Sequence, residues 1–147
     1  QYTARFIELA SEINTNMPFY VVEKVVDALN RMRKSVNGSD ILMLGVSYKK
    51  DIGDIRESPA LDIIKILQQK SACVYYHDPY VSPLDEGLFV QSVALTEEVL
   101  RNMDCVIIVT DHSSFDYPWI VDHASLIVDT RNAAREVTRG REKIVKL

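Results

Sequence analysis

The chain has 147 residues, of which 47% are hydrophobic and 26% are charged, so we expect one soluble, compact domain with room for an appended helix and not a self-contained two-domain enzyme. The net charge of −4 argues against nucleic acid or an anionic membrane surface as a partner. No apolar run approaches the roughly 20 residues that a membrane-spanning helix needs, so no membrane span is expected.

The two cysteines lie in apolar, β-branched stretches, where a cysteine is usually a small buried hydrophobic residue. Cys73 and Cys105 are therefore expected to be buried and reduced. No secretory signal is visible, which favours a cytoplasmic location. A start at Gln1 in place of methionine suggests a piece cut from a longer protein.

Two helices are expected before the first strand. Apolar residues at positions 6, 9, 10 and 13 have helical spacing, which the segment Asn14–Pro18 interrupts. Pro18 suits the first position of a second helix, whose apolar stripe runs from Val21 to Met32. A turn at residues 37–39 ends this helix.

After residue 40 the pattern changes to short, continuous apolar runs, which are typical of strands covered on both faces of a parallel sheet. Ser58 and Pro59 supply an N-cap and a first residue for a helix, and residues 97–102 predict another helix. Strands are expected at residues 41–46, 73–76, 105–110 and 126–128, with a further short candidate at 89–90. This alternation predicts an α/β fold with a Rossmann-like, doubly wound, mainly parallel sheet of about five strands, preceded by a helical segment.

In an open parallel sheet, ligands bind beyond the carboxyl ends of the strands. The residues that follow the expected strands include Tyr48, Asp78, Asp111, His112 and 129–132. Cationic side chains are found in the same places, beside a helix N-terminus that itself favours anions: Lys49, Lys50, Arg56 and Arg131. This collection predicts a phosphorylated ligand. The alternative is that they are solvated loop charges, as expected for most of the basic segment 131–147.

The motifs of several enzyme classes are missing. The five glycines form no G-x-G-x-x-G, and the loop after the first strand is longer than the tight turn of a dinucleotide site. There is no Walker loop or H-E-x-x-H, and His77, His112 and His123 lack metal-like spacing, so each is interpreted as a turn or surface residue. Ser47 and Ser58 have no nucleophile-elbow setting. We therefore expect neither a metal site nor a complete set of catalytic residues.

The loop after the first strand carries a long signature. Residues 45–60, G-V-S-Y-K-K-D-I-G-D-I-R-E-S-P-A, resemble the motif G-x-[AS]-[YF]-K-x-x-x-x-D-x-R-x-S-P-A that opens the C-terminal domain of the UDP-glucose/GDP-mannose dehydrogenase family. Residues 16–22 are similar to the end of that family's central domain, and residues 129–132 to its late D-[GT]-R element. The resemblance covers essentially the whole chain.

The resemblance implies an NAD-dependent enzyme that oxidises the C6 alcohol of a nucleotide sugar to a carboxylate. In this family an N-terminal domain binds NAD, a central helical domain carries the nucleophilic cysteine, and the C-terminal domain holds the substrate's nucleotide. Residues 1–36 would be the end of the central domain with its connecting helix, and residues 37–147 the UDP-binding domain. Alone, the chain would be inactive, because neither Cys73 nor Cys105 has the sequence context of the nucleophile. Its partners would be a UDP-sugar and the missing domains, with homodimerisation through the central helix in the full-length protein.

Carried over residue by residue, the resemblance assigns Tyr48, Lys49 and Arg131 to the UDP-sugar. Lys49 would lie against the diphosphate, and Arg131 would contact phosphate or a uracil oxygen. For Tyr48 alone, the alternative is a partly buried structural residue. Arg56 would reach NAD in the cleft between domains. The resemblance assigns no catalytic and no metal-binding residue.

Three alternatives accompany this interpretation. Asp54 and Glu57 would act structurally, by holding Arg56 through ion pairs. Residues 17–22 and the Tyr48-Lys49 pair are more similar to enzymes that act on UDP-N-acetyl-hexosamines than to UDP-glucose enzymes, which are the second choice. From a different class, the chain could be a non-catalytic α/β oligomerisation or receiver-like module, although Asp54 lies deep in a loop and Arg131 stands where a receiver needs a lysine.

Overall fold

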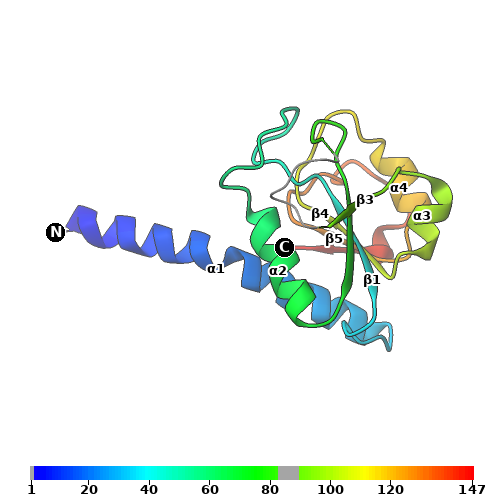
Figure 1. The fold of residues 1–147 in the computed structure, drawn as a ribbon, viewed down its shortest axis with the longest axis horizontal. Coiled ribbons are helices and arrows are strands. Elements are labelled where there is room, and N and C mark those ends of the chain that lie inside the picture. The colour runs from blue at the N-terminus through cyan, green and yellow to red at the C-terminus, as the bar shows by residue number, and fades with distance from the viewer. Residues whose placement is uncertain (1, 83–89) are drawn as a thin grey trace.

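In a computed structural model of the chain, the described residues form a six-stranded, all-parallel sheet with helices on both faces (Figure 1). The structure describes residues 2–82 and 90–147, and the side chains of residues 16–82 and 90–147. The strands are β1 (Asp40–Leu44), β2 (Cys73–His77), β3 (Gln91–Ser92), β4 (Cys105–Ile108), β5 (Ile127–Asp129) and β6 (Ile144–Lys146). The helices are α1 (Tyr2–Arg31), α2 (Pro59–Gln69), α3 (Glu97–Asn102), α4 (Tyr117–His123) and the 3-10 turn η1 (Arg141–Lys143).

In the strand order β3-β2-β1-β4-β5-β6, successive strands are added on one side of β1 up to β3 and on its other side from β4 onward. The switch point between β1 and β4 is typical of doubly wound nucleotide-binding folds. The predicted α/β class and parallel sheet are confirmed. β6 was not predicted, because three residues after a polar turn are too short a run to indicate a strand; its residues pair with β5, from Ile127 opposite Ile144 onward. No strand includes Val90, so the strand expected at 89–90 is not confirmed; the short strand β3 covers the next two residues, Gln91–Ser92, and Phe89 lies outside the described residues.

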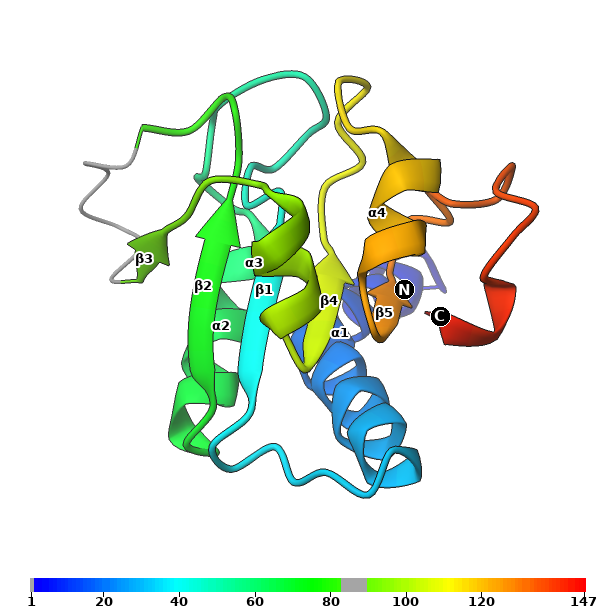
Figure 2. The same ribbon diagram turned by 90° about the vertical axis from the view of Figure 1, so that its right-hand side faces the viewer.

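The central strands contribute side chains to two hydrophobic cores, one on each face of the sheet. Figure 2 shows α3 and α4 on one face of the sheet, with α1 and α2 behind it. In β1, Ile41 and Met43 pack with the α1 and α2 core, whereas Leu42 and Leu44 pack with the α3 and α4 core. All four side chains are fully buried, which explains the continuous apolar run in the sequence.

α1 is one continuous helix, so the predicted break at Asn14–Pro18 is wrong. Pro18 supplies no N–H to the carbonyl four residues earlier, but its fixed φ is compatible with a helix. From Val21 onward the helix is held by packing, since Val25 and Leu29 are fully buried in the core beneath the sheet, and such burial outweighs local propensity. The N-terminal half projects away from the sheet (Figure 1). Although α1 has 30 residues, neither it nor any other described helix is apolar over a length that could cross a membrane.

The two cysteines differ in burial. Cys105 in the central strand β4 is fully buried, as predicted, and burial raises the pKa of its thiol to about 12. Cys73 is exposed, so the prediction for this residue is wrong. It begins β2, and β3 pairs with β2 only at Tyr75 and Tyr76, which leaves the start of β2 uncovered on that side.

The chain leaves β1 through a glycine that packs directly against the end of β4. Gly45 has a φ of +79°, and a Cβ there would lie 2.5 Å from the Cβ and 2.6 Å from the carbonyl oxygen of Thr110. From this point the loop runs to Ser58, whose Oγ accepts a hydrogen bond from the N–H of Ala60 and whose neighbour Pro59 begins α2. The predicted start of α2 is confirmed.

Gly45→Ala should therefore destabilise the fold more than Gly38→Ala. Gly38 has a similar φ of +81°, but a Cβ at this residue would meet no atom within 4 Å, so alanine there adds only the left-handed backbone strain, about 1 kcal/mol. At Gly45 the clash with Thr110 should add about 1–3 kcal/mol. Urea unfolding measures both variants, and equal losses would contradict the close approach of Gly45 to β4.

Candidate functional site

A pocket of about 530 Å³ opens at the carboxyl edge of the sheet, between α1, the start of α2 and the chain after β5. Met17, Pro18 and Val21 of α1 form its apolar wall. Tyr48 and Arg131, which are 83 residues apart in the sequence, both line it. The structure thus brings two of the three residues assigned to the substrate into one pocket.

Asp129 holds the backbone beside Arg131 in place. Its buried carboxylate at the end of β5 accepts hydrogen bonds from the N–H groups of Arg131, Ala133 and Ala134 at 3.1, 3.0 and 2.9 Å. The Nε of Arg131 donates to the carbonyl of Val109 at 3.0 Å. Within the described residues the two terminal nitrogens of Arg131 have no partner, so they are available to an anion in the pocket.

Four of the five other cations of the C-terminal segment are bound within the domain, and the fifth, Lys146, is exposed at the end of the chain with no side-chain partner among the described residues. Arg139 pairs with Asp122 at 3.0 Å, and Arg141 donates to the carbonyls of Ala134 and Val137. The Nζ of Lys143 donates to the carbonyl of Val121 at the end of α4, where a cation is favoured. Of the cations in this segment, which the structure describes in full, only Arg131 lines the pocket.

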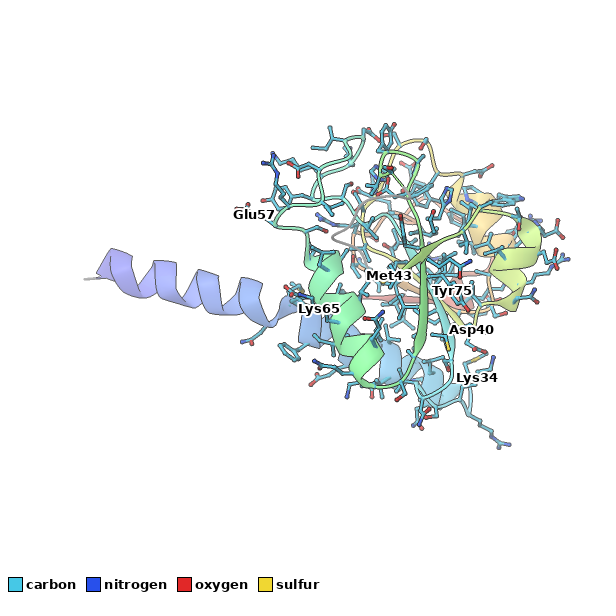
Figure 3. All side chains as sticks on the ribbon, viewed as in Figure 1. Lys34, Asp40, Met43, Glu57, Lys65 and Tyr75 are labelled. Carbon is cyan, nitrogen blue, oxygen red and sulfur yellow. The ribbon has the colours of Figure 1, made fainter. Side chains whose placement is uncertain are left out.

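Lys49 and Arg56 line a neighbouring hollow of about 400 Å³, which shares Tyr48 and Glu57 with the pocket. Lys49 lies beside Tyr48, with its Nζ 5.9 Å from the ring centroid. These two predicted residues are therefore adjacent to the pocket and do not line it. Glu57 lies at the end of α2 that carries this loop, well away from Lys65 further along the helix (Figure 3).

Arg56 is held by Asp54 through two hydrogen bonds, Nε to Oδ1 at 3.0 Å and a terminal nitrogen to Oδ2 at 2.9 Å. These bonds lower the pKa of Asp54 to about 2. The predicted ion pair of Asp54 is confirmed, whereas Glu57 makes no ion pair among the residues that the structure describes. The Arg56 side chain is nonetheless 86% exposed, so it faces solvent beyond the edge of the domain.

His112 is fully buried, so its interpretation as a turn or surface residue is wrong. Its Nδ1 accepts a hydrogen bond from the N–H of Asp51 at 2.8 Å, and its Nε2 lies 2.9 Å from Oδ2 of Asp78. Because Nδ1 is the acceptor, the proton is assigned to Nε2, and the ring is neutral. Asp78 directly follows β2, and His112 lies four residues after β4. Because β2 and β4 are the two neighbours of β1, this placement was the available signal that the two side chains lie close together.

Ser47, His112 and Asp78 do not form a nucleophilic triad. Both the Ser47 Oγ, at 3.3 Å, and the Asp78 carboxylate lie on the same histidine nitrogen, Nε2. A triad needs the two partners on different nitrogens. The Ser47 Oγ donates instead to the carbonyl of Lys49 at 2.9 Å, and Ser47 is fully buried. The cluster is therefore structural.

The same cluster occupies the place where a dinucleotide would meet the sheet. In dinucleotide-binding folds the diphosphate lies over a tight glycine turn after the first strand. Here the three buried side chains of Ser47, Asp78 and His112 fill this edge beneath the loop. These residues do not fit a dinucleotide, and in the described part of the chain no three His, Cys, Asp or Glu side chains gather in a way that could hold a metal ion.

Comparison with known proteins identifies relatives over most of the chain. Residues 42–136 match the model of the UDP binding domain of the UDP-glucose/GDP-mannose dehydrogenase family. A UDP-N-acetyl-D-mannosamine dehydrogenase of Methanococcus maripaludis is 34% identical over 76% of this chain and 25% of its own length. A UDP-glucose 6-dehydrogenase of Bacillus subtilis is 32% identical over 75% of this chain and 24% of its own length.

A solved structure has the same fold. The crystal structure of an NDP-N-acetyl-D-galactosaminuronic acid dehydrogenase from Methanosarcina mazei superimposes with a TM-score of 0.77 at 30% identity, over 95% of this chain and 30% of that one. The chain thus spans about a quarter to a third of the length of these relatives.

The carboxyl group of Asp54 should titrate at a midpoint near 2, because Arg56 stabilises its ionised form. Arg56→Gln should raise this midpoint toward the ordinary value of 3.8, whereas Glu57→Gln should leave it nearly unchanged. Carbon-13 NMR of the Asp54 carboxyl as a function of pH measures both. A midpoint that stays near 2 in Arg56→Gln would show that another group holds Asp54.

Proposed function

Since the chain belongs to the UDP-glucose/GDP-mannose dehydrogenase family, we propose that the pocket beside Tyr48 and Arg131 binds the uridine diphosphate of a nucleotide sugar. The observation that carries this proposal is Arg131, whose terminal nitrogens have no partner in the described part of the chain and whose backbone is fixed by Asp129. The start of α2 at Ser58 and Pro59 lines the same pocket and favours an anion.

The lining of the pocket suits a nucleotide better than a simple phosphate ion. Glu57 and Asp62 line it together with one cation, Arg131. The two carboxylates would repel a free anion, but they can accept hydrogen bonds from hydroxyl or N–H groups. The apolar side chains of Met17, Val21 and Ile63 complete the wall. A ligand with a phosphate group, sugar hydroxyls and a flat ring satisfies all three kinds of surface.

We propose that the complete enzyme oxidises the C6 alcohol of its UDP-sugar to a carboxylate with NAD, which would accept the hydride and would be bound mainly by an N-terminal domain outside this chain. Residues 1–36 would end the central domain and residues 37–147 would form the UDP-binding domain. The exposed Arg56 guanidinium, oriented by Asp54, would face the cofactor across the cleft. Neither cysteine suits a nucleophile's role, since Cys105 is a buried thiol with a raised pKa and Cys73 lacks the nucleophile's sequence context. Alone, the chain would catalyse nothing.

In that enzyme the contribution of this domain would be binding energy. Contacts with the nucleotide, remote from the reacting carbon, can orient the sugar toward the cofactor and the nucleophile. For the sugar we propose an N-acetyl-hexosamine, supported by the similarity of residues 17–22 and the Tyr48-Lys49 pair. UDP-glucose is the alternative, because relatives named for both substrates have almost equal identity to this chain.

Titration with UDP tests the proposed site. The wild-type chain should bind UDP, and Arg131→Ala should weaken binding at least about tenfold, because a hydrogen bond to a charged group contributes about 1.5–3 kcal/mol. Lys49→Ala should weaken it less, since Lys49 lies beside the pocket. Lys65→Ala, which removes the same charge from the exposed middle of α2, is the matched control and should leave the Kd unchanged. Calorimetry measures all four proteins.

Two results of this titration would contradict the proposed site. The first is no binding of UDP to the wild-type chain at millimolar concentration. The second is equal affinity of Arg131→Ala, Lys49→Ala and Lys65→Ala. Inorganic phosphate provides a further comparison, because a pocket with two carboxylates should bind it much more weakly than UDP.

A second proposal concerns α1, which carries exposed apolar side chains where it leaves the domain. Met17, Phe19 and Tyr20 are 39%, 57% and 45% exposed. Met17 belongs to the pocket wall, so we propose that a second copy of the protein covers Phe19 and Tyr20 in a homodimer of the full-length enzyme. In sedimentation experiments the wild-type chain should then associate with itself, and Phe19→Ser should shift it toward the monomer. Ile52→Ser, a similarly exposed apolar position in the loop, is the control, and equal behaviour of the two variants would contradict a role for α1.

A further inference from the structure

The loop of residues 46–54 carries Tyr48 to the pocket and Lys49 to the neighbouring hollow, yet the side chains of both residues are exposed and do not anchor the loop. Its shape must therefore come from other contacts, some within its backbone and some with buried side chains next to it. The N–H of Tyr48 donates to the carbonyl of Asp54 at 2.7 Å, which closes the loop on itself. Gly53 lies so close to the carbonyl of Tyr80 that no side chain could fit between them.

Asp78 anchors the start of the loop. Its Oδ2 accepts hydrogen bonds from the N–H of Val46 at 2.8 Å and of Ser47 at 3.3 Å, and its Oδ1 accepts one from the N–H of Tyr80 at 2.9 Å. The carboxylate is fully buried, and the Nε2–H of His112 is its fourth donor. A buried carboxylate with this many donors is a rigid anchor.

The far side of the loop is fastened to the chain after β4. The carboxylate of Asp51 accepts hydrogen bonds from the N–H and the Oγ of Ser113, both at 2.7 Å, which lower the pKa of Asp51. The N–H of Asp51 in turn donates to Nδ1 of His112 at 2.8 Å. His112 therefore links the two attachment points of the loop, with Asp78 at its Nε2 and Asp51 at its Nδ1.

We propose that His112 is a positioning residue of the nucleotide site, which, anchored by Asp78, fixes the backbone of residues 46–54 so that Tyr48 and Lys49 face the ligand before it binds. This inference rests on the proposed UDP site. A loop fixed in advance loses less conformational entropy on binding, so a chain without this fastening binds more weakly even when it is fully folded. The effect comes from the bond between Nδ1 and Asp51, and not merely from filling the core.

Two substitutions of His112 distinguish the hydrogen bond of Nδ1 from that of Nε2. The amide of His112→Gln can reach the position of Nε2 and keep a donor for Asp78, but it leaves the N–H of Asp51 without its acceptor. His112→Asn places an oxygen near the position of Nδ1 and keeps the acceptor for Asp51, but loses the bond to Asp78. His123→Gln, the same replacement in α4, is the control away from the loop.

The 147-residue chain and its three variants are compared by calorimetry with UDP, by amide hydrogen exchange at Asp51 and by urea unfolding to verify that each is folded. In His112→Gln the Asp51 amide should exchange at least about tenfold faster, and the Kd for UDP should rise about five- to tenfold. In His112→Asn the amide should stay protected and the Kd should rise less than about threefold. In wild type, nitrogen-15 shifts of the ring should show an unprotonated Nδ1 and a protonated Nε2.

Equal losses of UDP affinity in His112→Gln and His112→Asn, or an unchanged exchange rate at Asp51 in His112→Gln, would overturn the positioning role while the UDP site stands. Failure of the wild-type chain to bind UDP would overturn the proposed function itself. If the histidine variants do not fold, hydrogen exchange in the wild-type chain decides the question. A loop that is fixed before binding predicts that saturating UDP changes the exchange rate of the Asp51 amide less than about threefold. Protection of this amide that arises only with bound UDP would overturn the positioning role.

Discussion

The hydrogen bonds that converge on the buried carboxylate of Asp78 determine how the carboxyl edge of the sheet is built. Three backbone N–H groups and one histidine N–H donate to this carboxylate. They compensate the free energy of burying its charge and hold the surrounding backbone in one position. With this centre in place, the edge between β1 and β4, where doubly wound folds usually bind their ligand, is filled by the protein itself. The pocket lies instead toward β5, between α1 and the start of α2.

A second buried carboxylate works by the same principle on the other side of the pocket. Asp129 ends β5 as Asp78 follows β2, and each is at least nine-tenths buried and collects three backbone N–H groups. One fixes the chain that presents Arg131, and the other fixes the loop that presents Tyr48 and Lys49. The residues that we propose to touch the ligand are thus few and exposed, and their geometry comes from aspartates that the ligand does not touch.

The sequence predicted the features that follow from local pattern and missed those that depend on contacts between distant residues. Continuous apolar runs at residues 41–46 and 105–110 indicated β1 and β4, and Ser58-Pro59 marked the start of α2. Tyr48 and Arg131 were assigned together from motifs, and the structure places both in one pocket. The continuity of α1 through Pro18 depends on burial of Val25 and Leu29, and the burial of His112 depends on Asp78 and Asp51, 34 and 61 residues away. No local pattern carries such information.

The position of Pro18 and Met17 gives α1 a mechanical property. The helix is clamped to the sheet from Val21 onward, its other half projects into solvent (Figure 1), and the pocket touches it at the junction of these two halves. Met17 and Pro18, at the base of the projecting half, are part of the pocket wall. A force that tilts the projecting half therefore also moves this wall of the pocket. By linkage, a ligand bound against the wall would oppose the tilt, and the coupling free energy is the same in both directions.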